Sequence, residues 1–189
     1  MPKIVDHEQR RAAIAEALWR VVATGGIEAV TIRSVAAATP WSRGVVEHYF
    51  TNKEELLAYA CAQASQQALA QTKLRRKSLR GREALRAVLC DCANQDDVWF
   101  ELISLAAREP ALRAQLASFD AQISVLIAEI IAEMVARGEA ASDLDPAVEA
   151  RSVFAFNVGL KVNCRMQPQA ARKEIIETRI EEFLDHLQR

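Results

Sequence analysis

The sequence predicts an all-α fold of about nine helices. Glycine and proline are scarce, with six and five copies in 189 residues, so the chain has few breaks. Apolar residues recur at three- and four-residue spacing, and the strict alternation of a half-buried strand is absent. Apolar residues make up 51% of the chain, which is enough to bury a sizeable core.

The first fifty residues divide into three short helices. Residues 14–22 carry apolar side chains at helical spacing, and Gly25 with the glycine after it ends this first helix. Thr31 is expected to cap the second helix, because its hydroxyl can accept a hydrogen bond from a free amide of the first turn. Pro40 then breaks the chain, since proline lacks an amide donor and restricts the residue before it. Ser42 is expected to cap the third helix.

Prolines and glycines also divide the rest of the chain. In order, we expect a long Ala-rich helix from Lys53 into the seventies, helices at 82–93 and 95–108, a long helix from Pro110 to the break at Gly138, one helix from Pro146 and a last one after Pro168.

Charge is distributed unevenly along the chain. The formal net charge is -1, which excludes a molecule that is basic as a whole. Residues 1–53 carry seven Lys/Arg and five Asp/Glu, whereas the remainder carries seventeen and twenty. A mildly basic head on an acidic body suits a small unit that faces DNA.

Residues 31–50 have the pattern of a helix-turn-helix, in which two short helices are joined by a tight break. The second helix of such a motif lies in the major groove, where all four base pairs can be told apart, and the first helix crosses the backbone. The pattern places Val35, Ala36 and Val46 in a three-helix core. It places Arg43, Val45, Glu47 and His48 outward.

The same segment carries a longer motif of about fifty residues in the correct order and spacing. It comprises Thr31, Arg33, Val35 and Ala36, then Ser42-Arg43-Gly44, then Tyr49-Phe50, then Asn52-Lys53-Glu54-Glu55-Leu56. This motif resembles the tetracycline-repressor (TetR) family of bacterial transcriptional regulators. The resemblance implies a helix-turn-helix DNA-binding domain at 1–52 and a helical ligand-binding and dimerisation domain at 53–189.

The resemblance also implies roles for individual residues. Ser42 and Arg43 begin the helix that enters the groove, and Gly44 lets that helix approach the DNA closely. Tyr49 and Lys53 bind phosphates, and Phe50 locks the helix into the core. The residues expected to face DNA, from the pattern and the resemblance together, are Thr31, Arg33, Trp41, Ser42, Arg43, Gly44, Val45, Glu47, His48, Tyr49 and Lys53.

Three positions depart from the family pattern. Pro40 stands in the turn where glycine is usual, and Trp41 replaces a small aliphatic residue. Trp41 is expected either to plug the core beside the turn or to contact DNA. Glu47 replaces a tyrosine that touches DNA; it either accepts a hydrogen bond from a cytosine amino group or points away from the duplex. His48 is expected to contact the DNA backbone or to be solvated.

The body is expected to bind a small molecule and a second subunit. The candidate pocket residues are Trp99, Phe100, Ile103, Phe119, Ile123, Phe154 and Asn157, which would suit an apolar or planar effector. The same residues would also make a sound core. The candidate interface of a homodimer is formed by the last two helices, with Val153, Phe156, Leu160, Ile176, Ile180, Phe183, Leu184 and Leu187.

Other sites are weakly indicated or excluded. Residues 73–82 carry six basic residues and no acidic one, which indicates a solvated turn or a second DNA site. The histidines and the four cysteines lack metal-binding spacing, and no nucleophile elbow, phosphate loop or dinucleotide motif is present. We therefore expect no enzyme activity, no metal and no cofactor. No segment approaches the length of a membrane span.

The sequence thus predicts a ligand-responsive transcriptional regulator, most simply a repressor that binds a palindromic DNA operator as a homodimer and is released by a small molecule. The expected location is the bacterial cytoplasm, associated with the nucleoid when DNA is bound. The alternative is a helical small-molecule-binding or adaptor protein with a non-functional DNA-binding head.

Overall fold

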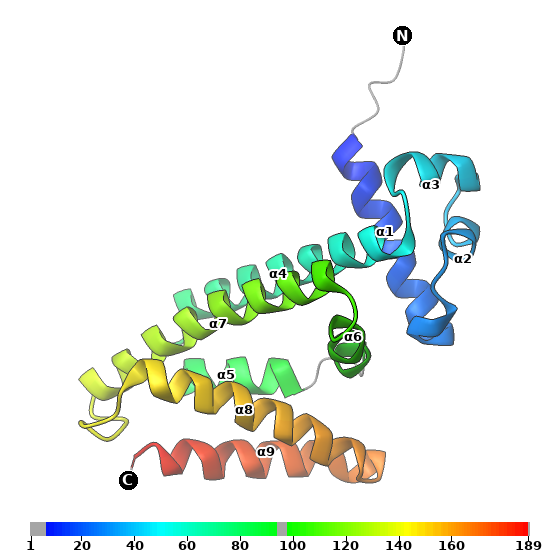
Figure 1. Cartoon of the computed structure of the whole chain (residues 1–189). Coiled ribbons are helices and arrows are strands. Elements are labelled where there is room, and N and C mark those ends of the chain that lie inside the picture. Colours follow the sequence, from blue (N-terminus) through cyan, green and yellow to red (C-terminus); the bar gives the residue numbers. More distant parts are fainter. Residues whose placement is uncertain (1–6, 94–97, 189) are drawn as a thin grey trace. The chain divides into compact units, whose positions relative to one another are not determined.

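The computed structural model describes residues 7–93 and 98–188, and within these ranges all side chains except those of residues 92 and 98–101. This part of the chain is helical throughout its regular structure, and the all-α prediction is confirmed (Figure 1). The elements are α1 (His7–Gly25), the short 3-10 helix η1 (Ile27–Ala29), α2 (Ile32–Ala37), α3 (Arg43–Tyr49), α4 (Lys53–Ser78), α5 (Gly81–Ala93), α6 (Val98–Ala106), α7 (Pro110–Ala136), α8 (Pro146–Arg165) and α9 (Gln169–His186). No helix within the described ranges has both the length and the apolar character needed to cross a bilayer.

The chain forms two compact units. The first combines residues 1–67 with 96–119, and the second combines 68–95 with 120–189. The long helices α4 and α7 each contribute to both units, so these units differ from the division after residue 52. That division is a statement about function and stays a prediction.

Local sequence signals begin several helices as expected. The side chain of Thr31 accepts a hydrogen bond from the amide of Ser34, and the hydroxyl of Ser34 accepts one from the amide of Thr31. This reciprocal pair is a capping box. Asp145 caps α8 in front of Pro146 by accepting hydrogen bonds from two amides of the first turn. Ser42 occupies the N-cap position of α3, but its side chain makes no capping hydrogen bond there.

The first unit has an apolar core to which α1, α2, α3 and the start of α4 all contribute. Val35, Ala36 and Val46 are buried in it as expected. Phe50, directly after α3, is also completely buried and fixes the end of that helix. Burying a large aromatic ring contributes on the order of 2 kcal/mol, so this core holds α3 firmly from one side.

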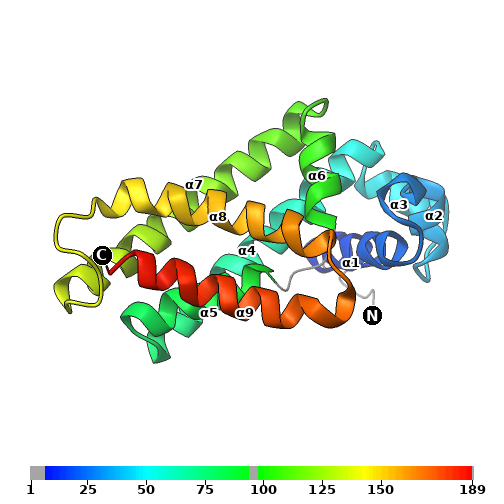
Figure 2. The same cartoon turned by 90° about the horizontal axis from the view of Figure 1, so that it is seen from below.

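In the second unit, α5 packs against both α8 and α9, and α8 packs against α9 (Figure 2). Six of the eight residues expected at the dimer interface are buried in the subunit's own core: Val153, Leu160, Ile176, Ile180, Leu184 and Leu187. The expectation that these side chains need a second subunit for cover is therefore corrected, because α5 and the facing helices already cover them.

Gly81 begins α5 with a φ of +48°, a conformation that favours glycine. A Cβ atom at this position would also collide with the carboxylate of Glu139. That carboxylate accepts a hydrogen bond of 2.8 Å from the backbone amide of Arg82, in the first turn of α5. This hydrogen bond, followed by that from Arg137, lowers the pKa of Glu139. The absence of a side chain at residue 81 thus makes room for the carboxylate that binds the start of α5.

Candidate nucleic-acid interface

The outer face of α3 is formed by exposed side chains on a buried base. Arg43, Gly44, Glu47 and His48 are exposed, whereas Val46 on the opposite side is completely buried. The exposed residues lie one, three and four positions apart, so they share one side of the helix. A helix anchored along one side in this way can present the other side to a groove.

The turn between α2 and α3 is held by side-chain hydrogen bonds. The hydroxyl of Thr39 donates to the carbonyl of Ala36 and accepts from the amide of Trp41, at 2.9 and 3.2 Å. Arg20 of α1 donates to the carbonyl of Ala38, at 2.9 Å. No residue of this turn has a positive φ. The turn therefore has no conformational requirement for glycine, which explains how Pro40 is accommodated.

Trp41 and Val45 contribute to the head's own packing. Both are half-buried and pack against the core of the first unit. The guanidinium of Arg10 lies 4.8 Å from the ring centre of Trp41, which is a cation–π distance. The interpretation of Trp41 as a plug beside the turn is thus supported. The outward placement of Val45 is corrected, because its side chain turns toward the core.

Tyr49 is more buried than a surface contact residue would be, with 9% of its surface exposed. Its ring packs against His7 of α1 and His48 of α3, with centroids 5.5 and 5.3 Å away. The hydroxyl of Thr31 is engaged in the capping box of α2, while Arg33 on the same helix is exposed. Phosphate binding by Tyr49 and Thr31 stays a prediction.

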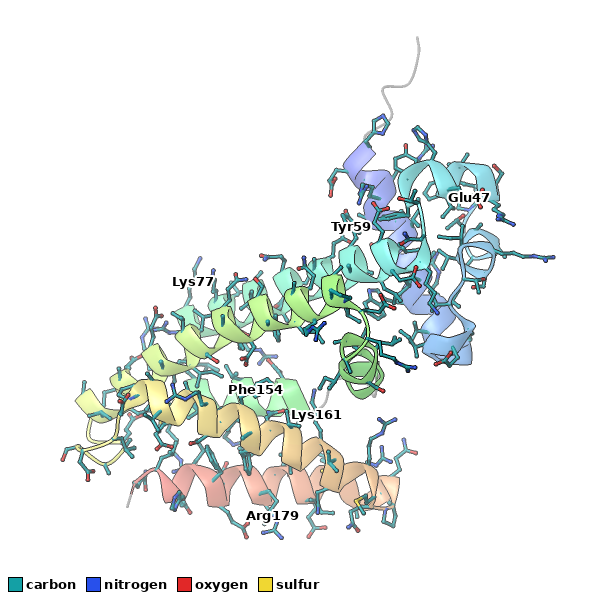
Figure 3. The ribbon with its side chains drawn as sticks, viewed as in Figure 1. Glu47, Tyr59, Lys77, Phe154, Lys161 and Arg179 are labelled. Atoms are coloured by element: carbon teal, nitrogen blue, oxygen red, sulfur yellow. The ribbon has the colours of Figure 1, made fainter. Side chains whose placement is uncertain are left out.

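Arg43 and Glu47 form an ion pair on the outer face of α3. The Nε atom of Arg43 donates to Oε1 of Glu47 at 2.7 Å, and the two side chains are 65% and 42% exposed. Glu47 is labelled on α3 in Figure 3. Glu47 therefore does not turn away from the exposed face. It lies beside the residue that is expected to read bases.

Gly44 lies in the first turn of α3, and its surroundings within the protein are empty. A Cβ atom built on it would meet no other atom of the chain within 4 Å. Neither packing nor a positive φ requires glycine here. The absence of a side chain at this exposed position leaves room for a molecule outside the chain to approach α3 closely.

Arg11 of α1 connects α1, α3 and α4, and sequence reasoning missed it. Its guanidinium donates to the carbonyl of Tyr49 at 3.1 Å and lies 3.6 Å from the carboxylate of Glu55. It also lies over the rings of Phe50 and Tyr59, at 4.4 and 4.6 Å. Because these partners are 38 or more positions away, no local pattern could have indicated this role.

The start of α4 is capped by the side chains of Asn52 and Glu55, and the Lys53 side chain takes no part in this cap. The Asn52 side chain accepts a hydrogen bond from the amide of Glu55 at 2.8 Å. The Glu55 carboxylate in turn accepts hydrogen bonds from the hydroxyl and the amide of Thr51. These hydrogen bonds, together with Arg11, lower the pKa of Glu55 against the opposing effect of burial. Lys53 is half-buried at the first position of the helix, next to amides that favour anions.

Comparison with known proteins accounts for both parts of the chain. The model of the bacterial regulatory proteins of the tetR family matches residues 14–60, and that of the BetI-type transcriptional repressor C-terminal domain matches residues 79–189. The chain belongs to the TetR family. Members of this family are transcriptional regulators, so this TetR protein is a ligand-responsive transcriptional regulator and not an enzyme.

Relatives of this TetR chain include the HTH-type regulator PksA of Bacillus subtilis, with 27% identity over 99% of this chain and 94% of PksA. The regulator BetI of Burkholderia mallei is 34% identical over 60% of this chain and 63% of its own length. A TetR-family regulator from Rhodococcus matches with a TM-score of 0.75 and 26% identity, over 96% of this chain and all of the other. A regulator from Saccharomonospora viridis, solved in complex with choline, shares the fold with a TM-score of 0.83 and 18% identity, over 95% and 97% of the two chains.

The basic run of the TetR chain is largely neutralised within the second unit. Its four arginines each contact a carboxylate, in the pairs Arg75–Asp91, Arg76–Glu129, Arg80–Glu133 and Arg82 with both Glu181 and Asp185. Lys73 and Lys77 are its cations without an ion pair among the described residues. The run lines a groove of about 360 Å³, formed by Lys73, Arg76, Lys77, Arg80, Leu126 and Glu133. Such pairing favours a structural role over a second DNA site.

The expected ligand-pocket residues fall in different parts of the structure. Ile103 and Phe119 belong to the first unit, whereas Ile123, Phe154 and Asn157 belong to the second. The side chains of Trp99 and Phe100 lie outside the described residues. None of the other five lines the groove beside the basic run. The pocket itself stays a prediction.

Asp120, which follows Phe119 on α7, is a polar residue that sequence reasoning did not select. Its Oδ1 atom is buried and has no hydrogen-bond partner among the described residues. Burial raises the pKa of this carboxyl group. A buried carboxylate oxygen without a partner is costly, so Asp120 is a candidate for contact with a ligand.

Proposed function

We propose that the chain is a homodimeric repressor that binds a palindromic operator and is released by a small molecule. The observation that carries this proposal is the exposed face of α3, which stands on a buried base and contains a glycine with nothing around it. In this proposal α3 enters the major groove, and Arg33 and Lys53 bind the flanking phosphates. The protein would act in the bacterial cytoplasm, on the nucleoid.

DNA binding is tested with a fluorescent duplex from the region upstream of the gene, in competition with an unrelated duplex at moderate salt. We expect clear preference for the upstream duplex. Replacement of Arg43 by alanine should weaken that specific complex roughly a hundredfold, because its contacts with base edges in the groove are lost. Arg113→Ala, which removes an exposed arginine from α7, serves as the control and should bind normally.

Two results distinguish the repressor from the alternative, a small-molecule-binding or adaptor protein with a non-functional DNA-binding head. A wild-type protein without preference for the upstream duplex would overturn the repressor proposal. The same protein, if it still bound a small molecule, would be an adaptor with an unused head. Circular dichroism and size analysis of Arg43→Ala must match wild type, so that lost binding cannot be due to lost folding.

The homodimer is proposed to form through the outer faces of α8 and α9. Val148 and Val162 of α8 and Met166, which follows the helix, are exposed by 43%, 44% and 77%, although each is a large apolar residue. Ala155 and Gly159 lie between them on the exposed side of the helix and would allow a second helix to approach closely. Phe156 and Phe183, both half-buried, stack with centroids 4.2 Å apart and join this face. An apolar face of this kind favours a second copy of the chain, because two-fold pairing is what a palindrome requires.

Sedimentation or light scattering of the full chain measures the dimer directly. We expect wild type to have twice the mass of one chain. Ala155→Glu places a charge in the centre of the face and should give a folded monomer with weaker operator binding. A wild-type monomer at micromolar concentration would contradict this part of the proposal.

The effector is proposed to be a small organic cation. Support comes from the unpaired carboxylate oxygen of Asp120 and from the BetI-type match of residues 79–189. The Saccharomonospora regulator, which shares the fold, was solved with choline, so choline is the first probe. It is titrated into the protein–operator complex, where we expect release. Asp120→Asn should bind the operator normally but lose the response to choline, and a full response in that variant would contradict the proposed contact.

A further inference from the structure

The outer face of α3 has no net charge, which is unusual for a helix expected to lie against phosphates. Arg43 is its cation and Glu47 is its anion. A carboxylate in the major groove faces the negative potential of the backbone, so it is unfavourable there unless a base donates a hydrogen bond to it. The position of Glu47 on this face therefore needs a reason that a solvated helix would not supply.

The geometry of the ion pair leaves hydrogen-bonding groups of both residues free. The contact joins Nε of Arg43 to Oε1 of Glu47. An arginine side chain has five N–H groups, so the two terminal nitrogens of Arg43 can still bind an acceptor pair as a fork. Glu47 keeps Oε2 as an acceptor. Both side chains are exposed on the side of α3 opposite Val46, which is completely buried.

We infer that Arg43 and Glu47 act as one unit that reads neighbouring guanine and cytosine bases, and that Glu47 determines specificity at the cytosine. This inference rests on the proposed DNA-binding function. Guanine offers the acceptors O6 and N7 to the fork of Arg43, and the cytosine N4 amino group donates to Oε2 of Glu47. Glu47 also holds Arg43 on the helix surface, so that the arginine is directed at bases and away from phosphates.

Such a unit has a consequence for affinity as well as for specificity. With Glu47 in place, Arg43 contributes little to sequence-independent binding, because its charge is already compensated. Removal of the carboxylate frees the guanidinium for phosphates. Glu47→Ala should therefore bind unrelated DNA more tightly. The slope of log affinity against log salt concentration should become steeper by roughly one for each DNA-binding head.

The test selects duplexes from a pool with randomised half-sites, using the full-length wild type, Glu47→Gln and Glu47→Ala. Wild type should enrich a guanine and a cytosine at neighbouring positions. Glu47→Gln should exchange the cytosine for adenine, because glutamine both accepts from N6 and donates to N7 of adenine. The preference at that position should change roughly tenfold, while the guanine is retained. Glu47→Ala should lose the preference there.

A matched control removes the same charge from the same unit. Glu28→Gln lies on η1, outside α2 and α3, and should leave every base preference unchanged. If wild type selects a defined sequence and Glu47→Gln selects the same one, the inference about Glu47 is overturned while the repressor proposal stands. If wild type selects no sequence at all, both fall.

Discussion

The arginines of the helix-turn-helix and those of the second unit's α4 and α5 have different surroundings. In the first unit, Arg33 is exposed on α2, and Arg43 pairs with a residue four positions further along its own helix. In the second unit, Arg75, Arg82 and Arg86 contact carboxylates of other segments, with Arg82 and Arg86 reaching α9 from α5. Arg33 and Arg43 are thus presented on the outside of the helix-turn-helix, whereas Arg75, Arg82 and Arg86 join helices, as Arg11 does within the first unit.

This difference shows that the density of basic residues does not locate a DNA-binding surface. Residues 73–82 are the most basic stretch of the chain, yet their arginines are paired with acidic residues. A local pair such as Arg43 and Glu47 costs little to rearrange, because exposed pairs of this spacing contribute only about 0.3–0.5 kcal/mol. The pairs of Arg75, Arg82 and Arg86 instead hold these cations against carboxylates of other helices. The number of basic residues in a segment is therefore no measure of the cations that it offers to DNA.

The comparison is tested most strongly by one substitution from each unit. Arg33→Ala should weaken binding to every duplex by about tenfold and reduce the salt dependence by roughly one unit per head, because a phosphate contact is lost. Lys77→Ala removes an exposed cation of the basic run, labelled in Figure 3, and should change the affinity by less than about twofold. Fluorescence anisotropy at several salt concentrations measures both. Equal losses of DNA affinity in the two variants would show that the basic run contacts DNA as strongly as α2 does.

Gly44 gives a second test, in which stability and binding should change in opposite directions. Gly44→Ala should raise the free energy of unfolding by up to about 1 kcal/mol, since alanine is the better helix former and the added methyl group meets no other atom. The same methyl group should weaken operator binding by about tenfold, by holding α3 away from the groove. Denaturant unfolding and anisotropy measure the two effects. Unchanged DNA affinity would show that α3 does not approach the duplex at this position.

The smallest expected effect concerns pH and the second unit. Hydrogen bonds from Arg86, and then from Arg82, lower the pKa of Glu181 in the folded chain. Its contribution to stability is therefore present above the ordinary glutamate pKa of 4.5, and it is lost as the pH falls through the lowered folded value. Wild type should lose more stability than Glu181→Gln on acidification, by less than about 1 kcal/mol because the pair is partly solvated.

Urea unfolding at a series of pH values from about 7 down to about 3 measures this difference. Glu174→Gln, an exposed position on the same helix, is the control and should follow wild type. A Glu181→Gln profile parallel to that of wild type would mean that the α5–α9 ion pairs add nothing to stability. DNA affinity at neutral pH should be the same in all three proteins.

Much of the fold could be predicted because its signals are local. Thr31 and Pro146 mark helix starts through hydrogen bonds and φ angles within a few residues, and both lie where expected. The burial of Val46 follows from helical spacing, and that of Phe50 was implied by the resemblance to the TetR family. The helix-turn-helix is itself a local motif, so its exposed residues could be named with few errors.

The remaining errors have one physical origin, since a helical pattern shows that a side chain is buried but not what buries it. Ile180 and Leu184 were expected against a second subunit, and the structure buries them within their own. Val45 was expected outside and packs against the core. The contacts of Arg11 depend on residues 38 and more positions away. Information of this kind arises only when the chain is folded.

Substitutions at Gly81 and substitutions on the outer face of α3 should cause loss of function in genetically different ways. Any side chain at residue 81 would have an unfavourable φ, at a cost of about 1–3 kcal/mol, and would displace the carboxylate that binds α5, so the substituted subunit would be destabilised. In the proposed homodimer, an allele that lowers the amount of folded subunit in this way would be recessive. A subunit altered only on the outer face of α3 would still fold, and in the proposed homodimer it would inactivate the wild-type subunit with which it pairs, which would make that allele dominant.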